Sequence, residues 1–147
     1  ENVSVYRRLA NENASTYRPR LAASLHIVGT LSSMSGRGDE AFAALRETQM
    51  IYETLSEDDP SEYLPMLAIV LQHLATQLSA LGHRHEEALS PAREAARIQR
   101  EFVKVNPEEH LPRLAALLRL EGVLLSQAGW PGRARRLRRG PGWAGGR

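Results

Sequence analysis

Cysteine is absent from the 147 residues of this chain. This excludes disulfides, thiolate metal ligands and cysteine nucleophiles, and it is compatible with a reducing, cytoplasmic location. Aromatic residues make up only 5% of the sequence, so a core has to be built from leucine, alanine, valine and isoleucine. This composition is typical of packed helices rather than of a β-sandwich. We therefore expect an all-α fold.

Long apolar runs are also missing. The longest one, at residues 66–71, has six residues, whereas a helix that spans a membrane needs about 20. We therefore expect no membrane partner.

Acidic residues are absent from residues 130–147, which carry six arginines. Residues 1–129 carry 13 lysines and arginines against 17 acidic residues, a net charge of −4 (13 − 17). The basic balance of the chain therefore belongs to an Arg/Gly-rich tail. Three interpretations of this tail stay open: a disordered terminus, a degenerate or frameshifted end, and, least favoured, a segment that binds an acidic partner or neutralises the phosphates of a nucleic acid.

A six-residue phrase occurs three times, at residues 17–22 (YRPRLA), 63–68 (YLPMLA) and 110–115 (HLPRLA). The prolines of the three copies are 46 and then 47 residues apart (65 − 19 and 112 − 65). A period in this range is typical of repeat arrays, in which each helical unit stacks on its neighbours. Such arrays bind other molecules more often than they catalyse reactions.

Each copy lies in a predicted helix with recognisable ends. An asparagine or aspartate at the start can accept hydrogen bonds from free backbone N–H groups: Asn13, Asp59 and Asn106. A glycine, which readily adopts the left-handed conformation, closes each helix: Gly36, Gly82 and Gly129. A second helix follows each of the first two glycines, and residues 2–12 correspond to the end of such a helix.

Apolar residues spaced by three and four positions mark the buried face expected for each first helix. The middle helix carries Leu64, Leu67, Leu71, Leu74, Leu78 and Leu81. The flanking helices carry Leu21, Leu25, Val28 and Leu31, and Leu111, Leu114, Leu118 and Leu125, with Glu121 interrupting the last stripe. The third helix has no clear partner, so we expect Leu117, Leu120 and Leu124 to be exposed and to favour self-association.

The second pair has one extra residue between Gly82 and Ala88, compared with Gly36 and Ala41 in the first pair. It also contains Pro91. Either Pro91 kinks the second helix, or this helix begins late, with Ser90 as its cap and Pro91 in its first turn. We favour the longer turn and the late start.

Small residues occupy equivalent positions in the predicted pairs, at Gly29, Ala75 and Gly122 on the first helices and at Ala41 and Ala88 on the second. Together with the turn segments at residues 35–42 (SGRGDEAF) and 81–89 (LGHRHEEAL), these positions resemble the tetratricopeptide repeat. The longer period is similar to the extended repeats of kinesin light chain and of bacterial regulatory proteins.

The resemblance implies a right-handed α-solenoid of antiparallel helix hairpins over residues 1–129, with units at about 17–62 and 63–109 and a partial unit at 110–129. It also implies a non-enzymatic scaffold that binds a protein or peptide partner, as part of a larger bacterial regulatory or signalling protein. The first helices would line a concave groove. The groove positions are Ala23, His26, Thr30, Ser33, Ile69, Gln72, Thr76, Ser79, Ala116, Arg119, Val123 and Ser126.

The candidates for chemistry are weaker. His83 and His85 lie near Glu86 and Glu87, but they lack the i, i+4 spacing of a helical zinc site. The segment is a turn, and we interpret it as solvated. The sequence contains no phosphate-binding loop and no nucleophile elbow. We therefore expect neither an enzyme nor a metal or other cofactor.

Overall fold

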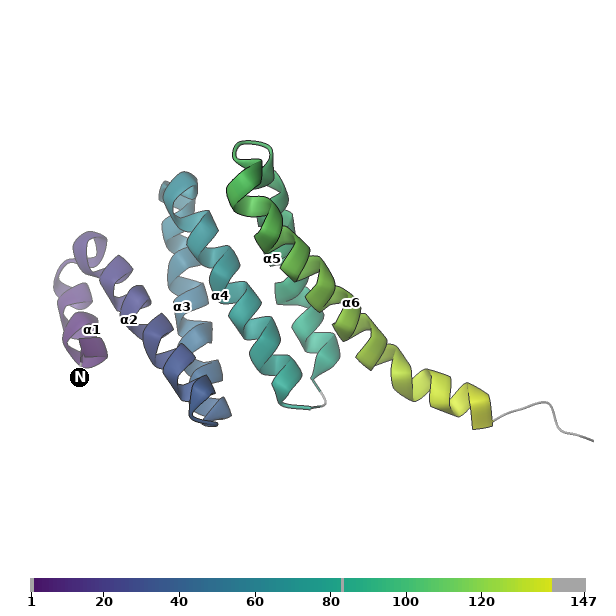
Figure 1. Cartoon of the computed structure of the whole chain (residues 1–147). Helices are drawn as coiled ribbons and strands as arrows, with labels where there is room; N and C mark the ends of the chain where they lie inside the picture. Colours follow the sequence, from purple (N-terminus) through teal and green to yellow (C-terminus); the bar gives the residue numbers. More distant parts are fainter. Residues whose placement is uncertain (1, 83, 139–147) are drawn as a thin grey trace, which may run out of the picture.

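The computed structural model describes residues 2–82 and 84–138 as six α-helices, with no strand among these residues (Figure 1). The all-α prediction is confirmed. The helices are α1 (Asn2–Glu12), α2 (Ala14–Met34), α3 (Gly38–Asp58), α4 (Pro60–Ala80), α5 (His85–Val103) and α6 (Pro107–Arg138).

Each helix packs mainly against the helices that precede and follow it in the sequence. The even-numbered helices also meet, since α2 contacts α4 and α4 contacts α6. Successive helices run in opposite directions and form an elongated row with α1 at one end and α6 at the other (Figure 1). Because contacts are made between neighbours, the buried side chains extend along the row instead of gathering around one centre.

The predicted helix starts are confirmed. The Asn13 side chain accepts a hydrogen bond from the Thr16 N–H at 3.3 Å, and the Asp59 side chain accepts one from the Glu62 N–H at 3.1 Å. The Asn106 side chain accepts one from the Glu109 N–H at 3.4 Å. Each cap satisfies a backbone N–H group that has no partner within its own helix.

Two of the three predicted helix ends are confirmed. Gly36 and Gly82 adopt the left-handed conformation just after α2 and α4, with φ angles of 72° and 81°. The end predicted at Gly129 is wrong, because α6 continues through it to Arg138. A glycine can also remain helical, and no further described helix turns back against α6 at this point. The basic tail was predicted over residues 130–147, of which residues 130–138 lie in α6 and residues 139–147 lie outside the described residues.

The extra residue of the second pair lies in the turn, as predicted. Helix α5 begins three residues after Gly82, at His85, whereas α3 begins two residues after Gly36, at Gly38 (85 − 82 and 38 − 36). The late start at Ser90 is wrong, because Pro91 lies inside α5. The longer turn absorbs the insertion without removing the first turn of the helix.

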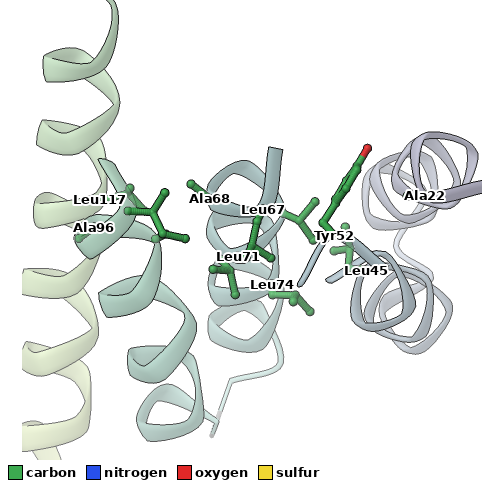
Figure 2. Close-up of a cluster of buried hydrophobic side chains, with 12 residues drawn as sticks. Ala22, Leu45, Tyr52, Leu67, Ala68, Leu71, Leu74, Ala96 and Leu117 are labelled. Carbon is green, nitrogen blue, oxygen red and sulfur yellow. The ribbon is translucent and has the colours of Figure 1, made fainter. Parts of the chain in front are cut away.

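The buried side chains form a cluster that extends from α2 to α6 (Figure 2). Leucines of α4 lie in its middle, and Leu71 and Leu74 are 2% and 1% exposed. The close approach at Gly29 is confirmed, since a Cβ atom there would lie 2.8 Å from Leu45 Cγ on α3. Ala75 and Ala88 are both fully buried, in a second cluster at the other end of α4.

The predicted buried faces of α2 and α6 are partly wrong. Val28 and Leu31 are exposed by 41% and 54%, because the short α1 covers only part of α2. On α6 the prediction is also wrong for Leu117 and Leu124, which are buried, and for Leu120, which is partly buried.

Helix α6 turns the face that carries Leu117 and Leu124 toward α5, its main neighbour. It thereby exposes three leucines that were predicted to be buried, by 43% to 50%: Leu111, Leu118 and Leu125. Glu121 is tolerated beside the buried face because its carboxylate accepts a hydrogen bond from Arg93 Nε of α5 at 2.9 Å.

Candidate functional site

The predicted groove residues lie on the even-numbered helices. We call this set the even-helix face, and its members are His26, Thr30, Ser33, Gln72, Thr76, Ser79, Arg119 and Ser126. The structure links three of these side chains to the next even-numbered helix, in each case to a residue that was not predicted from the sequence.

His26 forms the closest link. Its Nε2 atom lies 2.8 Å from Nδ1 of His73 on α4, and the two ring centroids are 4.9 Å apart. Burial lowers the pKa of both histidines, and the positive charge that His73 can carry lowers the pKa of His26 further. Both rings are therefore neutral at pH 7, so that one N–H donates to the other ring. The neighbouring Gln72 was predicted in place of His73.

Two further hydrogen bonds join the even-numbered helices. Ser33 Oγ donates to the Gln77 side-chain oxygen at 2.7 Å, and Ser79 Oγ donates to that of Gln127 at 3.4 Å. The Gln77 amide also donates to the Gly38 carbonyl at 3.5 Å. Gln77 is 6% exposed, and its position among the leucines of α4 concealed this polar role.

The remaining members of the face are less engaged with other helices. Thr30 and Thr76 donate to backbone carbonyls one turn earlier in their own helices, at 3.0 and 2.9 Å. Arg119 and Ser126 are exposed. A small cavity of about 110 Å³ lies between Thr30, Ser33, Met34, Leu45, His73 and Thr76. Much of the polar capacity of the even-helix face is thus used within the molecule.

A much larger concavity, of about 960 Å³, lies between α3 and α5, over α4. We call it the α3–α5 cleft. Its apolar lining includes Leu71, Leu74 and Leu78 of α4 together with Phe42 and Leu89. Its charged and amide lining comprises Arg46, Gln49, Glu53, Arg84, Glu86, Glu87, Arg93, Glu94 and Arg97. The sequence analysis missed this site, because its walls come from helices that are far apart in the sequence.

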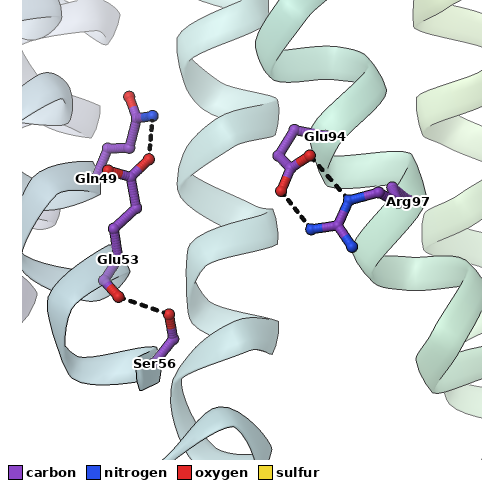
Figure 3. Close-up of polar contacts among 5 residues, drawn as sticks. All are labelled: Gln49, Glu53, Ser56, Glu94 and Arg97. Atoms are coloured by element: carbon purple, nitrogen blue, oxygen red, sulfur yellow. Dashed lines mark hydrogen bonds and ion pairs between the residues drawn. The ribbon is translucent and has the colours of Figure 1, made fainter. Parts of the chain in front are cut away.

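Hydrogen bonds link the polar side chains within each wall of the cleft. On α5, Arg97 Nε donates to Glu94 at 3.0 Å, and this hydrogen bond lowers the pKa of the Glu94 carboxyl (Figure 3). On α3, the Gln49 amide donates to Glu53 at 2.7 Å (Figure 3). At one end, the Arg84 guanidinium lies 5.1 Å from the centre of the Phe42 ring and thereby connects the two walls.

Four arginines and four glutamates line the cleft, so its formal charge is balanced. Carboxylates held ionised beside arginine are suited to charge-paired binding, whereas a general acid at neutral pH needs a raised pKa. The cleft is open to solvent and is not an enclosed cavity.

The histidines offer little for metal binding. Among residues 2–82 and 84–138, no three or more histidine, aspartate or glutamate side chains gather in a way that could hold a metal ion. His110 is buried, and its Nδ1 atom lies 2.9 Å from the Gln99 side-chain oxygen of α5. This histidine therefore stabilises the contact between α5 and α6.

None of the helices in the described part of the chain combines the length and apolar character needed to cross a membrane. The chain matches no known protein-family model, no curated protein and no solved structure.

Proposed function

We propose that this chain is a non-enzymatic scaffold that binds a peptide or helical segment of another protein. The observation that carries the proposal is the α3–α5 cleft of about 960 Å³, which combines an apolar base with charged walls. Leu71, Leu74 and Leu78 are only 2%, 1% and 6% exposed, so the apolar contact for a partner comes mainly from the partly exposed Phe42 and Leu89. The charged walls supply specificity. The balanced charge favours a partner segment with both acidic and basic side chains.

The proposal includes a right-handed solenoid of tetratricopeptide type in a cytoplasmic, bacterial regulatory or signalling protein. The three-fold sequence phrase, the capped helix starts and the neighbour-to-neighbour packing support the solenoid. The even-helix face is the alternative surface for the same partner, since Arg119, Thr76 and Ser126 remain exposed there.

A random peptide library displayed on phage, selected against the full chain, tests the proposal. Selected peptides should bind the unchanged protein and lose at least tenfold in affinity for an Arg46→Glu/Arg97→Glu variant of the cleft. The matched control is His26→Ala/Gln72→Ala/Arg119→Ala on the even-helix face, which should bind as the unchanged protein does. Loss in the control alone would place the site on the even-helix face, and failure to select any peptide would contradict the scaffold function.

Removal of residues 130–147 distinguishes the less favoured nucleic-acid function. A binder that uses the cleft should keep its peptide after this truncation. An electrostatic binder that uses the arginine-rich tail should instead lose affinity for a labelled oligonucleotide, and its binding before truncation should weaken steeply with salt.

A further inference from the structure

Helix α6 carries an apolar surface that no described helix covers. We call it the α6 outer face, made up of Leu111, Leu118, Gly122 and Leu125. Its three leucines are exposed by 50%, 43% and 46% and follow at intervals of seven residues, at positions 111, 118 and 125. A Cβ atom added at Gly122 would meet nothing within 4 Å. Such a continuous apolar stripe is typical of a helix that packs on another helix.

The repeat shows what covers the same surface elsewhere in the chain. A shift of 47 residues, from Pro112 to Pro65, places Leu118, Gly122 and Leu125 on Leu71, Ala75 and Leu78 of α4. These α4 residues are 2%, 0% and 6% exposed. Ala75 and Leu78 pack against Ala88 and Ala92 of α5.

Helix α2 shows the same arrangement one repeat earlier. Gly29, the counterpart of Ala75, approaches Ala41 and Leu45 of α3, at 3.4 Å from the Ala41 carbonyl for a Cβ atom. Ala41 and Leu45 correspond to Ala88 and Ala92 after a shift of 47 (88 − 41 and 92 − 45), one more than the shift of 46 from Gly29 to Ala75, because the second turn has an extra residue. In both α2 and α4, the small residue (Gly29 or Ala75) therefore lies near an alanine of the next helix (Ala41 or Ala88).

We infer that the α6 outer face binds an α-helix of the α5 type, which continues the series α3, α5 along the array. Its contact surface would carry small residues at positions i, i+4 and i+7, as Ala88, Ala92 and Ala95 do in α5, each of them fully buried. Gly122 provides at least as much room as Ala75, because it lacks a side chain. The surface is separate from the α3–α5 cleft, so the two can be tested independently.

A fluorescent peptide with the sequence of residues 84–104 serves as the probe, titrated with the full chain while fluorescence anisotropy is recorded. We expect saturable binding that weakens at least tenfold for Leu118→Asp and for Leu125→Asp, because each places a charge in the contact. Leu31→Asp is the matched control, since Leu31 is an equally exposed helical leucine far from α6, and it should leave the affinity unchanged. A peptide with Ala92→Glu should not bind.

Circular dichroism of each variant shows whether the helices are retained, and two α6 variants guard against a failure of either one to fold. Absence of peptide binding would overturn the inference, and so would binding by the Leu118→Asp and Leu125→Asp variants that is as strong as binding by the unchanged chain. It would also be overturned if the chain instead formed a dimer that Leu118→Asp dissociates, measured by light scattering, with no affinity for the peptide.

Discussion

Helices α4 and α6 share one sequence phrase but have different surroundings. Leu71 of α4 lies at the base of the α3–α5 cleft and is 2% exposed, whereas its counterpart Leu118 is 43% exposed. Helix α4 packs against both α3 and α5, and α6 packs mainly against α5. The same residue in the same repeat position is therefore buried or exposed according to the helices that flank it.

Truncation of the two leucines should give the largest difference between the helices. Leu71→Ala should lower the free energy of unfolding by about 2–5 kcal/mol, because it removes buried methyl groups and leaves a cavity. Leu118→Ala should lower it by about 1 kcal/mol or less, because much of that side chain already contacts water. Urea unfolding followed by circular dichroism measures both. Equal losses would show that another molecule covers α6 in solution.

Substitution of the two glycines Gly29 and Gly122 by alanine should change the stability of the protein with opposite signs. Gly29→Ala should destabilise the protein by about 1–3 kcal/mol, because the new Cβ would lie 2.8 Å from the buried Leu45 Cγ. Gly122→Ala has open space and should stabilise α6 by up to about 1 kcal/mol through helix propensity. Thermal unfolding gives both changes, and destabilisation by both substitutions would contradict the exposed position of Gly122.

Lowering the pH should weaken the α2–α4 contact and leave the α4–α6 contact unaffected. We expect this change in stability to be smaller than those of the leucine and glycine substitutions. The pKa values of His26 and His73 are lowered in the folded chain, so the unfolded chain binds protons more readily. The free energy of unfolding should therefore be constant above about pH 6.5 and decrease as the pH falls below it. A His26→Gln/His73→Gln variant should lose this dependence.

Chemical denaturation at several pH values between about 7.5 and 5 measures the effect of the histidines. This range lies above the region in which the lowered pKa values of Asp59 and Glu94 act, since both carboxyls titrate below their ordinary values of 3.8 and 4.5. An unchanged slope in the double variant would assign the pH dependence to other groups.

The sequence predicted helix starts and ends correctly where they depend on residues that are close together in the chain. Asn13 and Asp59 cap helices because their own side chains reach N–H groups three residues later. Gly36 and Gly82 end helices because the backbone there needs a positive φ angle. The spacing of the α4 leucines identified a buried face because neighbours cover that helix on both sides.

Sequence information failed where the outcome depends on a distant partner. The stripe of α6 is ambiguous, because Leu117 and Leu118 lie on adjacent faces and only the position of α5 decides which is buried. His73 was missed because its role depends on His26, one repeat away. The α3–α5 cleft was missed because no local pattern connects Arg46 with Arg97, although their separate charges are visible in the sequence.

The packing of each helix against its neighbours in the sequence also has a mechanical consequence. A force applied between the two ends of the row would act on a series of interfaces, each between consecutive helices. Each rupture would release one helix or hairpin, with the rest still folded, since stability in such arrays is a sum of local terms. The chain should therefore extend in a series of small steps at low force, rather than in one abrupt transition.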